Sequence, residues 1–245
     1  MQENTIQIPR EGAIYVNPNV ALDLKGQAFL IDGHDTNPDG TPGPGDDLPG
    51  ISTAFGDPAG DNEVAILSQI HWKQYEQVVG LDDEEPSIGE TDEVDIDGLV
   101  SQLESSVHET VASGTYSNVT WGDWATDDME VVIADGDLKL TGTGTGAGIL
   151  VVKGDPTLSG SFSYAGIIVV LGDIRLVGGG SSTHLWGSLI AQESLEAMDS
   201  SAEVFVSGSA DIVYSSVVLD WLEAEFSSSA AAGYETVYYD EPTSH

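Results

Sequence analysis

Short apolar runs recur between glycine-containing corners over the middle of the chain. Between residues 142 and 190 these runs include Ile149–Val152 and Ile167–Leu171. Gly-Asp pairs at 136–137, 154–155 and 172–173 recur every 18 residues. Short strands at one period with glycine corners are typical of stacked coils. The pattern predicts a mainly β fold, a small parallel β-solenoid with coils of about 18 residues. The usual hand of parallel crossovers predicts right-handed winding.

Further strands are predicted on both sides of these repeats. Near the N-terminus, Ala13–Val16, Val20–Leu24 and Ala28–Ile31 are separated by Asn-Pro-Asn and Lys-Gly-Gln turns. They are expected to form one more coil that caps or begins the stack. After residue 190 the pattern weakens, and it predicts strands at Ala202–Val206 and Ile212–Tyr214.

Apolar positions at helical spacing predict helices at Glu63–Val79, Asp97–Ala112 and Val217–Phe226. An amphipathic helix must bury its apolar stripe, so two or three helices should pack on the side or end of the solenoid. The expected organisation is one structural domain. It comprises an N-terminal coil with an Asp/Gly/Pro-rich loop (1–60), a helical insert (61–115), solenoid repeats with a capping helix (116–225) and a polar tail (226–245).

The net charge of the chain limits the classes of molecule that it can bind. Six Lys and Arg residues stand against 42 Asp and Glu, which gives a formal charge of -36 over 245 residues. Such a chain repels nucleic acids and anionic membrane surfaces. No apolar run approaches the ~20 residues of a spanning helix, so no membrane contact is expected. The acidity favours a saline or calcium-containing exterior.

One acidic loop has the spacing of a calcium ligand set. Asp35, Asn37 and Asp39 are followed by glycine at the sixth position, by Thr41 at the seventh and by Asp46 at the twelfth. Oxygen ligands at these positions converge on a hard cation in helix-flanked calcium loops. Here a strand precedes the loop and no helix is predicted after it. Calcium binding and an acidic surface turn held by side-chain hydrogen bonds therefore both stay open.

Catalytic motifs are not apparent in the sequence. A polyuronate lyase needs a basic Arg or Lys, and the six cations are scattered along the chain. A glycoside hydrolase needs only two carboxylates and stays open as an alternative. The aspartates of the Gly-Asp corners, Asp137, Asp155 and Asp173, are expected to accept backbone N–H bonds in their turns. Enzymatic activity is not expected.

Several segments, in this order, resemble the extracytoplasmic region of PilX-type pilus-assembly proteins, which are minor-pilin-like. They are AFLIDGHDTNPDGTPGPG, VVGLDDEEPSIG, TWGDW, GTGAGILVVKGDPTLSGSFSYAGIIVVLGDIRLVGGG and IVYSS. The repeat alone also resembles the polymer-forming bactofilins. Members of the pilus family begin with a hydrophobic pilin-like helix that this sequence lacks. The expectation is a soluble portion of such a protein or a secreted relative.

The resemblance implies a noncatalytic structural and adhesion domain associated with a type IV pilus. It implies an extracellular or cell-surface location, with passage through the periplasm before assembly. The expected partners are other pilus or cell-surface proteins, and a surface polysaccharide is a further candidate. Two alternatives stay open: a carbohydrate-binding or carbohydrate-active solenoid, and a self-assembling filament in which coil ends stack.

Overall fold

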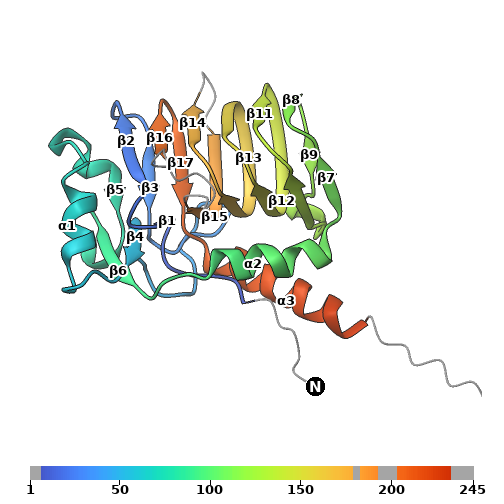
Figure 1. Cartoon of the computed structure of the whole chain (residues 1–245), viewed down its shortest axis with the longest axis horizontal. Helices are drawn as coiled ribbons and strands as arrows, with labels where there is room; N and C mark the ends of the chain where they lie inside the picture. Colours follow the sequence, from blue (N-terminus) through green and yellow to red (C-terminus); the bar gives the residue numbers. More distant parts are fainter. Residues whose placement is uncertain (1–6, 179–182, 193–202, 233–245) are drawn as a thin grey trace, which may run out of the picture.

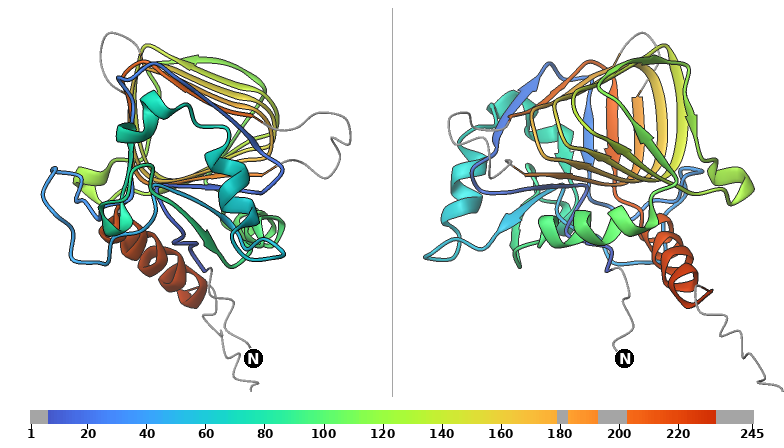
Figure 2. Two further views of the ribbon diagram at one scale, coloured as in Figure 1. Left: turned by 90° about the vertical axis from the view of Figure 1, so that its left-hand side faces the viewer. Right: turned by 45° about the vertical axis from the view of Figure 1, so that its right-hand side comes forward.

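The computed structural model describes residues 7–178, 183–192 and 203–232. The described strands belong to one sheet, and the paired strands run parallel. The sheet curls so that its strands lie on three faces around a common core (Figures 1 and 2). The predicted mainly β, parallel, solenoid-like architecture is confirmed, while its right-handed winding stays a prediction.

Each face is a ladder of parallel strands. Face 1 contains β9 (Thr120–Trp121), the first half of β12 (Thr143–Val152), the middle of β13 (Pro156–Val170), the first half of β15 (Thr183–Ala191), β17 (Ala210–Val213), β3 (Leu30–Asp32) and β5 (Val78–Val79). Face 2 contains β7 (Glu109–Val111), β10 (Glu130–Ala134), the ends of β12, β13 and β15, β1 (Ile14–Val16), β4 (Ile51–Ala54) and β6 (Ile88–Thr91). Face 3 contains β8 (Gly114–Ser117), β11 (Leu138–Thr141), the start of β13, β14 (Ile174–Gly178), β16 (Glu203–Ser207) and β2 (Ala21–Lys25).

The 18-residue period sets the register between neighbouring coils. Val131 pairs with Ile149, and Ile149 pairs with Ile167. The strands bend between faces 1 and 2 at a column of stacked glycines. A Cβ built on Gly166 would lie 1.8 Å from the carbonyl oxygen of Gly148. Only glycine permits this approach, which explains its recurrence at the corner.

Both sides of face 2 are buried. Ile149 and Ile167 are at most 1% exposed, and so are their neighbours Leu150 and Ile168. One set points into the solenoid, and the helix α2 (Ile96–Leu103) covers the outside with its buried apolar residues. A strand buried on both faces reads as a continuous apolar run, as the sequence does here.

The coils do not follow chain order. The N-terminal strands β1, β2 and β3 stack on β15, β16 and β17 from the C-terminal part. Beyond them, β4 and β5 continue two of the faces, so the N-terminal coil lies inside the stack rather than at its end. After β6 the chain follows α2 along the molecule and re-enters the sheet at β7, at the opposite end (Figure 1).

Two of the predicted helices are shorter than expected. The helix predicted at 63–79 is α1 (Asp61–Leu67), a 3-10 helix η1 (Trp72–Gln77) and the strand β5, because the chain turns at Ser68 to bring Gln69 against β2. The helix predicted at 97–112 ends as α2 at Leu103, followed by η3 (Glu104–Ser106) and β7. The prediction placed Glu109–Val111 in a helix, but these residues pair with β10.

The remaining predicted elements fall close to their places. The last helix, α3, extends over Ser216–Ala232 and so includes the first residues of the predicted polar tail. Residues 233–245 of that tail lie outside the described residues. The predicted helical insert, 61–115, also contributes the strands β5, β6 and β7. Two further 3-10 turns are η2 (Leu81–Asp83) and η4 (Trp124–Thr126).

Candidate functional site: the outer surface of face 3

The helices α2 and α3 cover only part of the solenoid surface. In the described part of the chain, α2 lies against face 2, and α3 lies near the corner of faces 1 and 2 (Figure 2). Val218 of α3 packs on Ala147 and Ala165, and the ring of Trp221 meets Trp124 edge-on at 4.6 Å. These contacts pack Trp124 against α3. On face 3, Thr115, Lys139 and Arg175 are exposed.

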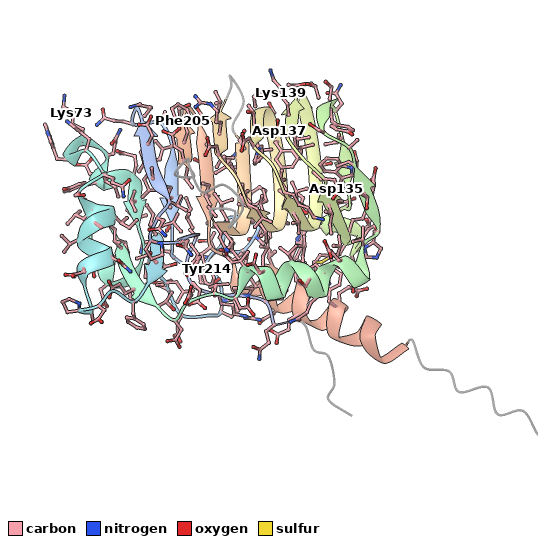
Figure 3. All side chains as sticks on the ribbon, viewed as in Figure 1. Lys73, Asp135, Asp137, Lys139, Phe205 and Tyr214 are labelled. Atoms are coloured by element: carbon pink, nitrogen blue, oxygen red, sulfur yellow. The ribbon has the colours of Figure 1, made fainter. Side chains whose placement is uncertain are left out.

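Outward side chains on face 3 form a column across neighbouring strands. The register aligns Thr115, Lys139, Thr157, Arg175, Phe205 and Asp23. The guanidinium carbon of Arg175 lies 3.9 Å from the centroid of the Phe205 ring, a close cation–π contact. Figure 3 shows Lys139 and Phe205 on the same side of the molecule, away from Tyr214. Strand pairing therefore assembles a basic and aromatic row from distant segments.

A second outward row is rich in hydroxyl groups. Ser159, Val177, Ser207 and Lys25 align across β13, β14, β16 and β2. On the outer coils, Ser117 Oγ and Thr141 Oγ1 lie 2.7 Å apart. The Nζ of Lys25 lies 2.6 Å from Asp23 Oδ1. Apart from its cations, the acidic Asp23 and Glu203 and the apolar Val177 and Phe205, these rows present small polar groups on rigid strands.

The positive charge of the protein is concentrated on this face. Three of the six cations, Lys25, Lys139 and Arg175, project from its strands. Within the described residues, neither Lys139 nor Arg175 has a carboxylate at ion-pair distance. Elsewhere Arg10 pairs with Asp220 and Glu223 of α3. Hydrogen bonds to Glu104 and Asp135 raise the pKa of Lys153 above its ordinary value.

The Gly-Asp corners border face 3 and form a ladder of hydrogen bonds. Oδ1 of Asp137 accepts the N–H of Asp155 at 3.0 Å, and Oδ1 of Asp155 accepts the N–H of Asp173 at 2.9 Å. Asp173 in turn accepts the N–H of Glu203 at 2.9 Å. The predicted structural role is confirmed, but each carboxylate binds the N–H of the next coil rather than one in its own turn. The ladder thus stabilises the stacking of coils.

The predicted calcium ligands bond mainly to protein groups. Asp35 is 4% exposed, and its carboxylate accepts the N–H and the hydroxyl of Ser216, each at 2.7 Å, and the N–H of Gly45 at 2.6 Å. The hydroxyl and the N–H of Thr41 donate to Asp39 Oδ1 and lower the pKa of Asp39. Asn37 donates through Nδ2 to Thr41 Oγ1 and to the carbonyl of Pro42.

The last predicted ligand, Asp46, lies apart from these bonds. It lines a cleft of about 500 Å³ together with Arg10 and Tyr214. Asp47, its neighbour, accepts the N–H of Asp35 at 2.9 Å. Across residues 7–178, 183–192 and 203–232, no group of three or more His, Cys, Asp or Glu side chains is arranged to hold a metal ion. Calcium binding by this loop stays a prediction.

A larger cleft of about 630 Å³ lies between the N-terminal segment, the start of α2 and α3. Its polar lining is mainly carboxylate, from Glu11, Asp92, Glu93, Asp95 and Glu223, with Arg10 at its rim. The Arg10 guanidinium bonds to Asp220 and Glu223, so the structure uses this cation to hold α3 against the N-terminal segment.

Sequence reasoning treated the cations as scattered and so missed face 3. A signal was available, because Lys139 and Arg175 are two 18-residue periods apart with Thr157 between them. Residues one period apart stack on adjacent strands, and the same periodicity that predicted the fold could have aligned them. Phe205 lies in a coil of different length, and only the structure places it beside Arg175.

Comparisons with known proteins identify no family for this chain. No family model matches, and no curated protein matches. A solved structure of an ice-binding protein from an Arctic yeast, LeIBP, is similar at 14% sequence identity and a TM-score of 0.42, covering 87% of this chain and 96% of that one. In the part of the chain with described coordinates, no helix is long and apolar enough to cross a membrane.

Proposed function

We propose that this chain is a noncatalytic structural and adhesion domain of an extracellular, type IV pilus-associated protein, and that face 3 is its binding surface for an acidic polysaccharide. The observation that carries the proposal is the row of Lys139, Arg175 and Phe205 on a solvent-accessible face of a protein with a formal charge of -36. The PilX-type resemblance supports the pilus association.

The charge distribution supports an acidic ligand. A polyanion is repelled by most of this surface, so it approaches where Lys139 and Arg175 project without a carboxylate at ion-pair distance. Arg175 and Lys139 lie two strands apart, ~10 Å at the usual strand spacing. Arg175 holds its guanidinium against the Phe205 ring, which leaves N–H groups to bind a carboxylate. Rigid strands keep these groups in place and so reduce the entropy lost on binding.

Binding to polygalacturonate, with dextran as the neutral control, tests the ligand. We expect the protein to bind polygalacturonate in low salt, to bind it less as salt rises, and not to bind dextran. Arg175→Gln should weaken binding. Lys153→Gln is the matched control, because it removes one positive charge outside the row of Lys139, Arg175 and Phe205, from a residue that pairs with Glu104 and Asp135. Equal binding of both polymers, or equal loss in both variants, would overturn the acidic-ligand proposal.

A separate assay for polymer cleavage tests the alternative that the protein is a carbohydrate-active enzyme. If the protein cleaves polygalacturonate, reducing ends or unsaturated products accumulate during incubation. We expect neither to increase over a blank. A steady increase that scales with protein concentration would replace the adhesion proposal with an enzymatic one.

The pilus association is tested by location. Antibodies raised against the folded chain should label surface filaments of intact cells in immunogold microscopy. Labelling confined to the cell interior would contradict both the extracellular location and the pilus association, whatever the polymer binding shows.

A further inference from the structure

The two ends of the solenoid are finished differently. At the end formed by β2, β5 and β6, α1 and η1 cover the strands (Figure 1). Gln69 Oε1 accepts the N–H of Leu22 at 2.8 Å, and Gln74 Nε2 donates to the carbonyl of Leu24 at 2.6 Å, so two side chains replace a neighbouring strand along β2. On β6, Glu90 accepts N–H groups from the start of α1. This end is capped.

The opposite end is open. β7, β8 and β9 pair on their inner sides with β10, β11 and β12, and no other described strand pairs with their outer edges. On β8 the N–H of Gly114 donates inward to Asp137. Because successive residues of a strand alternate direction, the N–H and carbonyl of Thr115 face the free edge. An unpaired edge of this kind binds another strand readily.

The open coil is also depleted of charge. Residues 109–121 contain one charged residue, Glu109, whereas 20% of the whole chain is charged. Most of the coil is exposed, and Tyr116 and Trp121 close the core behind it with ring centroids 6.2 Å apart. Two molecules of charge -36 repel one another over most of their surface, and the strands of this coil add only Glu109 to that repulsion.

We propose that the open end is the docking surface for a second copy of this chain, with two solenoids joined end to end about a two-fold axis through their β7–β9 coils. The unpaired edges supply matching donors and acceptors, and a two-fold contact uses the same patch on both molecules. Because α1 and η1 cap the other end, assembly stops at the dimer and does not continue into a filament. The contact is made by the free strand edges and does not require a bound polysaccharide.

Sedimentation equilibrium of the full chain over a wide concentration range tests the dimer, in salt high enough to screen long-range repulsion. Thr115→Pro removes the outward N–H, and Thr115→Glu brings two like charges together across the axis. Each should raise the dimer dissociation constant about tenfold or more. Thr157→Glu is the matched control, because it adds the same charge to the same column two strands from the end and should leave the constant unchanged.

Circular dichroism melts establish whether each variant is folded. If Thr115→Pro does not fold, Thr115→Glu alone tests the interface, because it leaves the backbone N–H in place. A monomer at every concentration would overturn the proposal. So would a dimer that neither Thr115 variant weakens, because its contact would lie elsewhere. Filaments instead of dimers would show that the α1 cap does not terminate assembly, and would overturn the two-fold arrangement.

Discussion

The carboxylate of Asp35 accepts both the backbone N–H and the side-chain hydroxyl of Ser216, each at 2.7 Å, across 181 residues of sequence. Ser216 is the first residue of α3, where helix N–H groups lack partners within the helix. A buried carboxylate at this position stabilises the helix start and joins the acidic loop to α3. The loop is therefore part of the packing of α3.

Asp35→Ala should lower the free energy of unfolding by roughly 2 kcal/mol, because it leaves the donors of Ser216 and Gly45 buried without an acceptor. Urea unfolding followed by circular dichroism measures the change. Asp39→Ala is the control in the same loop, since Asp39 is exposed and bonds only to Thr41. Equal losses in the two variants would contradict the role of Asp35.

Calcium binding by the same loop predicts that EDTA lowers the melting temperature and that Asp39→Ala removes this sensitivity. Differential scanning calorimetry with and without added calcium measures both effects. A melt that neither chelator nor calcium moves would eliminate the site and leave the loop as a purely hydrogen-bonded turn.

The ladder of corner aspartates predicts a difference between two substitutions at one position. Asp155→Ala removes the acceptor of the Asp173 N–H and should cost about 1 kcal/mol of stability. Asp155→Asn keeps an oxygen at Oδ1 as an acceptor and should retain most of the stability of the wild type. Chemical denaturation of both proteins gives the comparison. If the alanine variant is as stable as the wild type, the ladder contributes nothing to coil stacking.

Acid should weaken the capped end through Glu90. The N–H of Gly60, with those of Glu63, Gly56 and Asn62, lowers the pKa of Glu90 in the folded protein. A carboxylate with a depressed pKa contributes stability above its unfolded pKa and loses it as the pH falls through the folded value. The protection factors of the α1 amides, which are corrected for the pH dependence of intrinsic exchange, should therefore fall in acid. Glu90→Gln should flatten this dependence. Unchanged profiles in the variant would assign the acid response to other groups.

Periodicity alone predicted much of the fold. A stacked coil places residues one period apart on adjacent strands, so the 18-residue spacing was enough to align Ile149 with Ile167 and Asp137 with Asp155. The glycine corners were equally readable, because a stacked corner has no room for a Cβ. These features depend on local chain geometry repeated at a fixed interval.

The order of the coils and the surroundings of the candidate sites needed the tertiary structure. Nothing in the local pattern of β2 indicates that it pairs with β16, which is more than 170 residues away in the sequence. The loop spacing predicted Asp35 as a calcium ligand, and only the structure showed that its carboxylate accepts hydrogen bonds from Ser216. In the sequence the cations are far apart, and only the strand pairing places Arg175 against Phe205. Short-range sequence determines repeats and corners, while contacts between distant segments depend on how the whole chain packs and are decided only by the folded structure.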